Sequence, residues 1–233
     1  EGIQYSSSDS LDIIVPGIGT HGAAPHLGRD PVYIASQIVT ALQSIDSREI
    51  SPVKPVVVTV GSFHAGSKHN IISDEAKLQV TVRANDEETR EQVIATVERI
   101  AVNIGKAHGL PDTMPVTVTR LPGTPTTIND AALARRLNAV MQRELGAAAF
   151  QPFEQKNMGA EDFTYFVTEG LGVPGYYFAV GGTTPERLAA AKAGGPPIAG
   201  HHSPLFQVAP RESVVLGTRA MVAAVMDLAP KKK

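Results

Sequence analysis

Hydrophobic and polar residues alternate with two different periods along the first half of the chain. Alternation with a period of two predicts strands at residues 11–15, 54–66, 76–84 and 115–120. Apolar residues at helical spacing predict amphipathic helices over 31–45 and 86–109. Asp30 is a suitable N-cap with Pro31 at the first helical position, which supports the first of these helices. The predicted order of elements is β-α-β-β-α-β.

That order is typical of a ferredoxin-like domain, an antiparallel sheet with two helices on one face. The second half of the chain has fewer strand signals. Its pattern predicts, in order, a helix at 131–145, a strand at 150–157, a short capped helix within 158–170, a strand at 175–182, a loop at 183–204 and a helix at 212–228. This alternation indicates α/β layering, but two strands are too few for a closed α/β domain. The predicted fold class is therefore α+β followed by part of an α/β domain.

Composition excludes several classes of function. The 233 residues are 42% hydrophobic and 19% charged, with a formal net charge of -2 and one like-charge run, at Lys231–Lys233. We therefore expect no nucleic-acid partner. No apolar run approaches the ~20 residues that cross a bilayer, so we expect no membrane partner. The absence of cysteine excludes disulfides and thiolate ligands within the chain and leaves its compartment undecided.

Two histidines lie in the glycine-rich stretch "GTHGAAPH". Its small residues could clear space for a ligand, and His21 could then stabilise an oxyanion or bond to a substrate carbonyl. The alternative is that His21 and His26 only brace the following helix. His26 is the weaker candidate, because Pro25 and the nearby N-cap give it a structural role.

Asn70 lies in the turn before the third predicted strand, and Arg83 lies at the end of that strand. The Asn70 amide could hold the turn "KHNII" or donate to a substrate, and by its position alone the turn is favoured. Arg83 could form a bidentate pair with a carboxylate, although a strand-end arginine in solvent is the more common case.

Two further candidates lie in the second half of the chain. Glu161 in "MGAEDF" could cap a helix or contact a metal shell or a substrate ammonium. His202 in "HHSPLF" could ligate zinc or manganese through one ring nitrogen, although a single isolated histidine is more often structural. "GIGTHG" lacks the spacing of a dinucleotide-binding loop.

Taken in order, "GTHGAAPHLGRDPV", "VVVTVGSFHAGSKHNIISDEAKLQVTVR", "MGAEDF" and "GHHSPLF" resemble one family. They are similar to the C-terminal half of the amidohydrolase branch of the dinuclear metallopeptidases. This branch includes the hippurate, N-acyl-amino-acid and auxin-conjugate hydrolases, and is related to aminoacylase and carboxypeptidase G.

The resemblance implies a ferredoxin-like lid and dimerisation domain at 9–120. Residues 1–8 would be the end of a catalytic-domain segment and the hinge, and residues 121–233 the C-terminal part of the catalytic domain. It implies that His202 is the last metal ligand and that His21 stabilises the substrate carbonyl, often across a homodimer. It assigns Asn70, Arg83, Glu161 and, less directly, His26 to substrate binding.

The family's other metal ligands and its general base belong to an N-terminal segment that these 233 residues do not contain. We therefore expect the parent protein to bind two divalent ions, zinc, manganese or cobalt, and to hydrolyse the amide of N-acyl amino acids or similar conjugates. The chain alone is expected to bind metal weakly or not at all and to be inactive.

Two other interpretations stay open at this point. One is a non-catalytic dimerisation or small-ligand-binding module. The other is a ferredoxin-like regulatory domain unrelated to hydrolysis.

Overall fold

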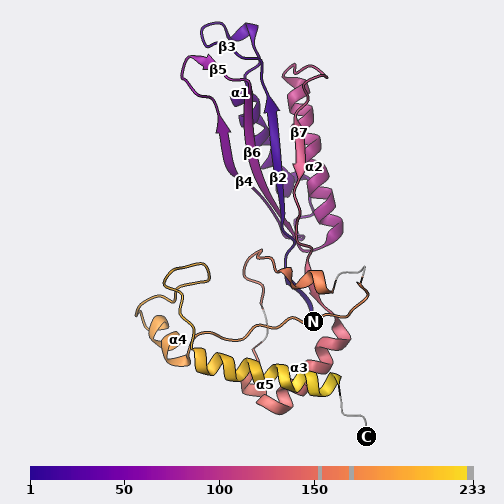
Figure 1. The fold of residues 1–233 in the computed structure, drawn as a ribbon, viewed down its shortest axis with the longest axis vertical. Helices are drawn as coiled ribbons and strands as arrows, with labels where there is room; N and C mark the ends of the chain where they lie inside the picture. Colours follow the sequence, from indigo (N-terminus) through magenta and orange to yellow (C-terminus); the bar gives the residue numbers. More distant parts are fainter. Residues whose placement is uncertain (152–153, 168–170, 230–233) are drawn as a thin grey trace. The chain divides into compact units, whose positions relative to one another are not determined.

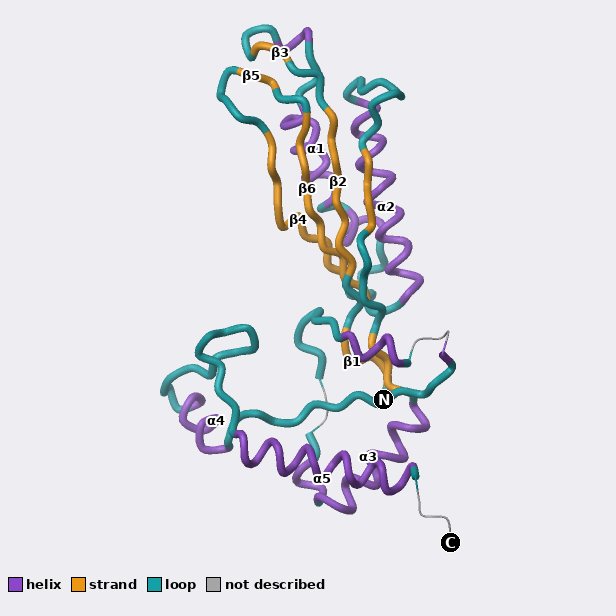
Figure 2. The backbone as a smooth tube through the Cα atoms, in the orientation of Figure 1, coloured by secondary structure: helices purple, strands orange, loops and turns teal. Residues whose placement is uncertain are grey.

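The computed structural model describes residues 1–151, 154–167 and 171–229 and divides the chain into two compact units. We call Ile3–Ile128 with Gln155–Gly175 the sheet unit. We call Glu1–Gly2, Asn129–Glu154 and Tyr176–Lys233 the helical unit. Figures 1 and 2 show the elements of each unit.

A four-stranded antiparallel sheet forms the centre of the sheet unit (Figure 1). Its spatial order is β4 (Val56–Ala65), β6 (Glu75–Ala84), β2 (Asp9–Pro16) and β7 (Thr117–Arg120). The helices are α1 (Pro31–Leu42) and α2 (Glu87–Ala107), so the chain runs β2-α1-β4-β6-α2-β7. This is the element order that the hydrophobic alternation predicts.

Alternate residues of the central strands form the core together with the two helices. Leu11 and Ile13 on β2 and Leu78 on β6 are fully buried, and they share one apolar cluster with Ile38 of α1 and Val97 of α2. Since successive strand residues point to opposite faces, the helices cover one face of the sheet and leave the other open.

Each of the two helices begins directly after an aspartate that acts as its N-cap. The Asp30 carboxylate accepts the Val32 amide at 2.9 Å, and the Asp86 carboxylate accepts the Thr89 amide at 2.8 Å. The first helix ends at Leu42, earlier than expected, and a wider π-helical turn follows at Ile45–Glu49.

A buried ion-pair cluster joins the start of β2 to α2 and β7. Asp9 is fully buried; its Oδ2 accepts Arg90 Nε at 2.7 Å, and its Oδ1 lies 2.9 Å from Arg120 Nη2. Hydrogen bonding to Asp9 raises the pKa of Arg90 above its ordinary value, so the guanidinium stays charged. The carboxylate thus connects three elements that are distant in sequence.

Two short pairings complete the strands of the structure. Strand β3 (Thr20–His21) pairs with β5 (Ile71–Ile72) beyond one end of the main sheet. Strand β1 (Gly2–Tyr5) pairs with β8 (Thr127–Asn129).

The helical unit contains α3 (Ala131–Leu145), α4 (Pro185–Lys192) and α5 (Pro210–Leu228). Leu137 and Met141 of α3 pack on Ala220 and Ala224 of α5, with Tyr176 and other half-buried apolar side chains around them. The opposite side of α5 exposes a row of apolar residues: Val214, Val215, Met221, Val222, Val225 and Met226.

The strand predicted at 175–182 is wrong, because no strand forms there. A strand requires a hydrogen-bonding neighbour, and here the Asn129 side chain takes that place: it donates to Tyr177 O at 2.7 Å and accepts the Tyr177 amide at 2.6 Å. The strand predicted at 150–157 is also absent from its described residues, and residues 152–153 lie outside them.

Two other expectations for this half need correction. The predicted loop 183–204 contains α4, which begins at the Thr184 N-cap followed by Pro185. Within 158–170 the described helix is only a 3-10 turn, Asp162–Phe166, and residues 168–170 lie outside the described part. Among the described residues, no helix is both long and apolar enough to cross a membrane.

We predict that Asp9→Asn lowers the free energy of unfolding of the chain by about 3–5 kcal/mol, because it removes the buried carboxylate that pairs with Arg90 and Arg120 and leaves the buried Arg90 guanidinium only the exposed Glu87 as a partner. Denaturant unfolding measures the change. Asp12→Asn is the control on the same strand: Asp12 pairs with Lys77 at the surface, so its loss should be much smaller. Equal losses in the two variants would contradict the structural role of Asp9.

Candidate functional site

The glycine-rich loop brings His21 and Asn70 together at one end of the sheet unit. His21 lies opposite Ile71 in the β3–β5 pairing, and the Gly22 amide donates to Asn70 O at 2.7 Å. A Cβ on Gly22 would lie 3.1 Å from that carbonyl. Gly22 therefore makes room for the chain's own backbone, and it also lines the pocket described below.

The His21 imidazole is exposed, and one of its nitrogens is occupied. The Ala23 amide donates to His21 Nδ1 at 3.1 Å. The neutral ring therefore carries its proton on Nε2, which is left as an outward hydrogen-bond donor. His21 thus braces its loop and also offers a donor.

Asn70 does not hold its turn through its side chain. The residue is exposed, and among the described residues its amide group has no hydrogen-bond partner, so the turn role favoured from sequence is wrong. His26 lies in the short 3-10 turn Pro25–Leu27, is exposed and provides no side-chain cap. Both side chains are free to meet a ligand.

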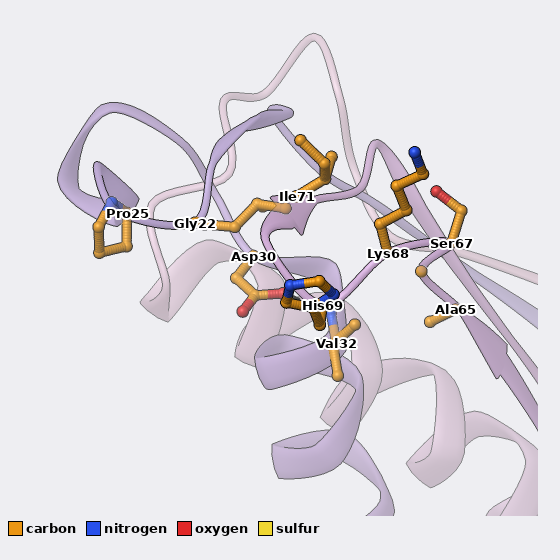
Figure 3. A pocket seen from close by; sticks show the side chains of 11 residues that line it. Gly22, Pro25, Asp30, Val32, Ala65, Ser67, Lys68, His69 and Ile71 are labelled. Atoms are coloured by element: carbon orange, nitrogen blue, oxygen red, sulfur yellow. Dashed lines mark hydrogen bonds between the residues drawn. The ribbon is translucent and has the colours of Figure 1, made fainter.

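A pocket of about 620 Å³ lies beside His21 and Asn70 (Figure 3). His69, Asp30, Val32 and Lys68 line this pocket, and Figure 3 shows the Lys68 ammonium pointing away from the other three. The Asp30 carboxylate is already used as the cap of α1. Sequence reasoning missed this pocket because residues 67–70 form an unremarkable polar turn; their density of polar side chains was the one available signal.

Arg83 lies near the other end of β6, where it pairs with Val57. Its neighbours Val82 and Ala84 are buried under the helices, so Arg83 lies on the open face. The side chain is half-buried, and no hydrogen bond or ion pair to it occurs among the described residues. At about 3.3 Å per residue, the run from Glu75 to Arg83 alone spans about 26 Å, so one copy cannot bring Arg83 to His21.

Glu161 precedes the 3-10 turn Asp162–Phe166 but does not cap it with its side chain. The Thr127 hydroxyl donates to its backbone carbonyl at 3.5 Å, and Thr164 donates to Thr126 O at 3.2 Å. The capping role considered from sequence is therefore wrong. In the described part of the chain the half-buried Glu161 carboxylate has no partner.

His202 belongs to the helical unit and is exposed, and its backbone has a φ of 66°. Histidine enters this left-handed region more readily than most residues, yet the conformation still costs about 1 kcal/mol or more. The neighbouring His201 ring packs on Phe206 with a centroid distance of 4.9 Å. The turn thus holds His202 outward.

The residues present do not fit a complete metal site. No group of three or more histidine or acidic residues able to hold an ion occurs in the described part of the chain. His202 could supply a single ligand, which is fewer than the three or four that a zinc site requires.

Comparison with known families identifies the first half of the chain. Residues 6–109 match the family model M20_dimer, described as a peptidase dimerisation domain. This part of the chain is therefore a peptidase dimerisation domain of the M20 type.

Named relatives are hydrolases. The chain is 34% identical over 166 residues to the hippurate hydrolase of Campylobacter jejuni, covering 71% of this chain and 42% of the relative. It is 42% identical over 108 residues to an N-acyl-L-amino acid amidohydrolase of Geobacillus stearothermophilus, covering 46% and 29%. The chain thus spans less than half the length of either relative.

Solved structures share the mixed α/β fold. A candidate aminohydrolase from methicillin resistant Staphylococcus aureus superposes with a TM-score of 0.76 at 24% identity, covering 99% of this chain and 54% of that one. The Bacillus subtilis YXEP protein, a dinuclear metal binding peptidase of the M20 family, gives a TM-score of 0.65 at 22% identity, covering 97% and 51%.

We predict that Gly22→Ala opens the β3–β5 pairing, because the added Cβ presses on the Asn70 backbone. Amide exchange at position 22, followed by NMR, should become at least tenfold faster. Gly61→Ala is the control, since a Cβ there meets nothing within 4 Å. Unchanged exchange in Gly22→Ala would mean that this contact does not hold His21 beside Asn70.

Proposed function

We propose that this chain is part of a metal-dependent amidohydrolase that cleaves the amide bond of N-acyl amino acids or similar conjugates. The relatives' names, the dimerisation domain and the order of the candidate site residues support this proposal. The chain by itself is inactive on this proposal, because its residues do not fit a complete metal site.

The sheet unit serves as a ferredoxin-like lid, with domain bounds near 9–120, after the hinge 1–8 and before the catalytic part 121–233. The antiparallel order β4-β6-β2-β7 with two helices on one face supports this assignment. The lid forms a homodimer. Among the described strands none pairs with the outer edge of β4, and such an edge is suited to pairing with a second copy.

His21 stabilises the substrate carbonyl. Its Nε2–H is available, since Nδ1 accepts the Ala23 amide, and a donor of this kind can bond to the oxygen on which negative charge develops. Asn70 lies beside it with a free amide and contributes a second polar contact. His26, exposed in the same loop, contacts the outer part of the substrate.

Arg83 binds the substrate's free carboxylate through a bidentate pair. The observation that carries the proposal is its separation from His21 by about 26 Å of strand. One substrate amide and its carboxylate are too close together to reach both residues of one copy. Each site of the dimer therefore combines His21 and Asn70 from one copy with Arg83 from the other.

The two remaining candidates, His202 and Glu161, act at the metal-binding part of the proposed site. His202 supplies one ligand, and Glu161 lies near the metals and contacts the substrate. Two divalent ions, zinc, manganese or cobalt, would polarise the amide and activate water in the parent protein. Their other ligands lie outside residues 1–233 on this proposal.

A second candidate function is a non-catalytic dimerisation or ligand-binding module. The dimerisation-domain match and the lack of a metal-binding group among the described residues favour it for the isolated chain. Metal-dependent hydrolysis by residues 1–233 alone would exclude it.

We predict that in the full-length parent, loaded with metal, Arg83→Ala raises the KM for hippurate by about tenfold to a hundredfold, because one charge-assisted hydrogen-bonded contact is lost. Steady-state kinetics measures this change. Arg99→Ala, which removes a surface arginine paired with Glu49, is the control and should leave KM unchanged. The methyl ester of the substrate should show no difference between Arg83→Ala and wild type. An unchanged KM for hippurate in Arg83→Ala would contradict the proposed role.

A further inference from the structure

Three polar side chains from distant parts of the sequence meet inside the sheet unit. Ser6 is fully buried, Asn85 is 7% exposed and Gln155 is half-buried. Ser6 follows β1, Asn85 follows β6, and Gln155 is the first residue of the segment that returns to this unit. We call these three residues the amide cluster.

The three side chains of the amide cluster are hydrogen-bonded to one another. Asn85 Nδ2 donates to Gln155 Oε1 at 2.9 Å, and Gln155 Nε2 donates back to Asn85 Oδ1 at 3.2 Å. Ser6 Oγ donates to Asn85 Oδ1 at 2.7 Å and accepts Gln155 Nε2 at 2.9 Å. Each side chain both donates and accepts, so the loss of one member disturbs the other two.

Hydrogen bonds of the backbone also connect Ser6 and Ser7 to the end of β6 and to the segment 155–159. The Ser6 amide donates to Gly159 O and the Ser7 amide to Ala84 O, each at 2.8 Å. The Ser7 hydroxyl accepts the Ala84 amide at 3.1 Å. The two serines thus bind the end of β6 and the segment 155–159 at once.

Each of these two segments carries a candidate site residue. Arg83 lies two residues before Asn85, and Glu161 lies two residues after Gly159. Their side chains have opposite charge, yet neither is paired within the described residues. Opposite charges on loosely held segments can approach and pair with each other, whereas a rigid connection keeps both available for a ligand.

We propose that the amide cluster is a positioning device that fixes the end of β6, with Arg83, at a constant separation from the segment that carries Glu161. Asn85 is then a positioning residue for recognition of the substrate carboxylate by Arg83. The link to substrate rests on the proposed function, while the fixed separation does not.

The separation can be measured directly, because the chain has no cysteine and accepts spin labels at chosen positions. Labels on Thr59→Cys and Asp162→Cys, both exposed positions, report the distance between the sheet and the Glu161 segment. Asn85→Asp keeps the shape of the side chain but removes the donor to Gln155, and should at least double the width of this distance distribution. Asn103→Asp, on the exposed side of α2, should leave it unchanged.

A second label pair separates local loosening from unfolding. Thr59→Cys and Thr119→Cys report on the edge strands of the sheet, and Asn85→Asp should not broaden their distance distribution. Broadening of both pairs, or of neither, would overturn the proposal. Gln155→Glu, with exposed Gln151→Glu as its control, repeats the test if Asn85→Asp does not fold.

Kinetics in the full-length, metal-loaded parent tests the positioning role. Asn85→Asp should raise the KM for hippurate at least tenfold with a smaller change in kcat, and should not affect the KM for the methyl ester. A broadened distance with unchanged kinetics would show a structural role only and overturn the positioning role. Absence of hydrolysis by the wild-type parent would instead refute the proposed function, and the label distances would still decide whether the cluster fixes the separation.

Discussion

Strand β6 is a central element, and its length determines where the candidate residues of the sheet unit can lie. It is hydrogen-bonded to β4 on one side and to β2 on the other, which keeps it extended along its length. The β3–β5 pairing lies beyond its first residues, and Arg83 lies near its last. About 26 Å of strand keeps His21 and Asn70 away from Arg83 of the same copy. A twofold dimer offers a way to bring the two ends into one site.

The two units differ in how completely their apolar and polar groups are buried or paired within the unit. The sheet unit has a continuous apolar core and a buried ion-pair cluster around Asp9. The helical unit has a small core, a strand-like segment whose backbone is bonded by the Asn129 side chain, and an apolar row on α5 that no described residue covers. Such a surface is typical of a partner-binding face. The two named relatives are each more than twice as long as the segment that matches this chain. Their greater length is consistent with a partner for the exposed face of α5.

Sequence reasoning succeeded where local pattern and long-range structure agree. The alternation in β2 and β6 and the cap Asp30 are local signals, and they predicted the order of elements in the sheet unit. It failed at 175–182, where the residues favour a strand but the neighbour that a strand needs is not among those described. The family resemblance named the candidate site residues, but only the structure showed that His21 and Asn70 lie at one end of the sheet and Arg83 at the other. The amide cluster was invisible in sequence, since Ser6, Asn85 and Gln155 are common polar residues far apart in the chain.

Complementation between two impaired variants, assayed at a hippurate concentration well below the wild-type KM, tests most directly whether one site draws on two copies. Full-length parent proteins carrying His21→Ala or Arg83→Ala are purified separately, then mixed in equal amounts under conditions that exchange subunits. Half of the resulting dimers are mixed, and each of these has one intact site, so hydrolysis should recover to about a quarter of the wild-type rate. If His21 and Arg83 act from the same copy, every site in the mixture lacks one of them, and no recovery above the separate variants will be seen.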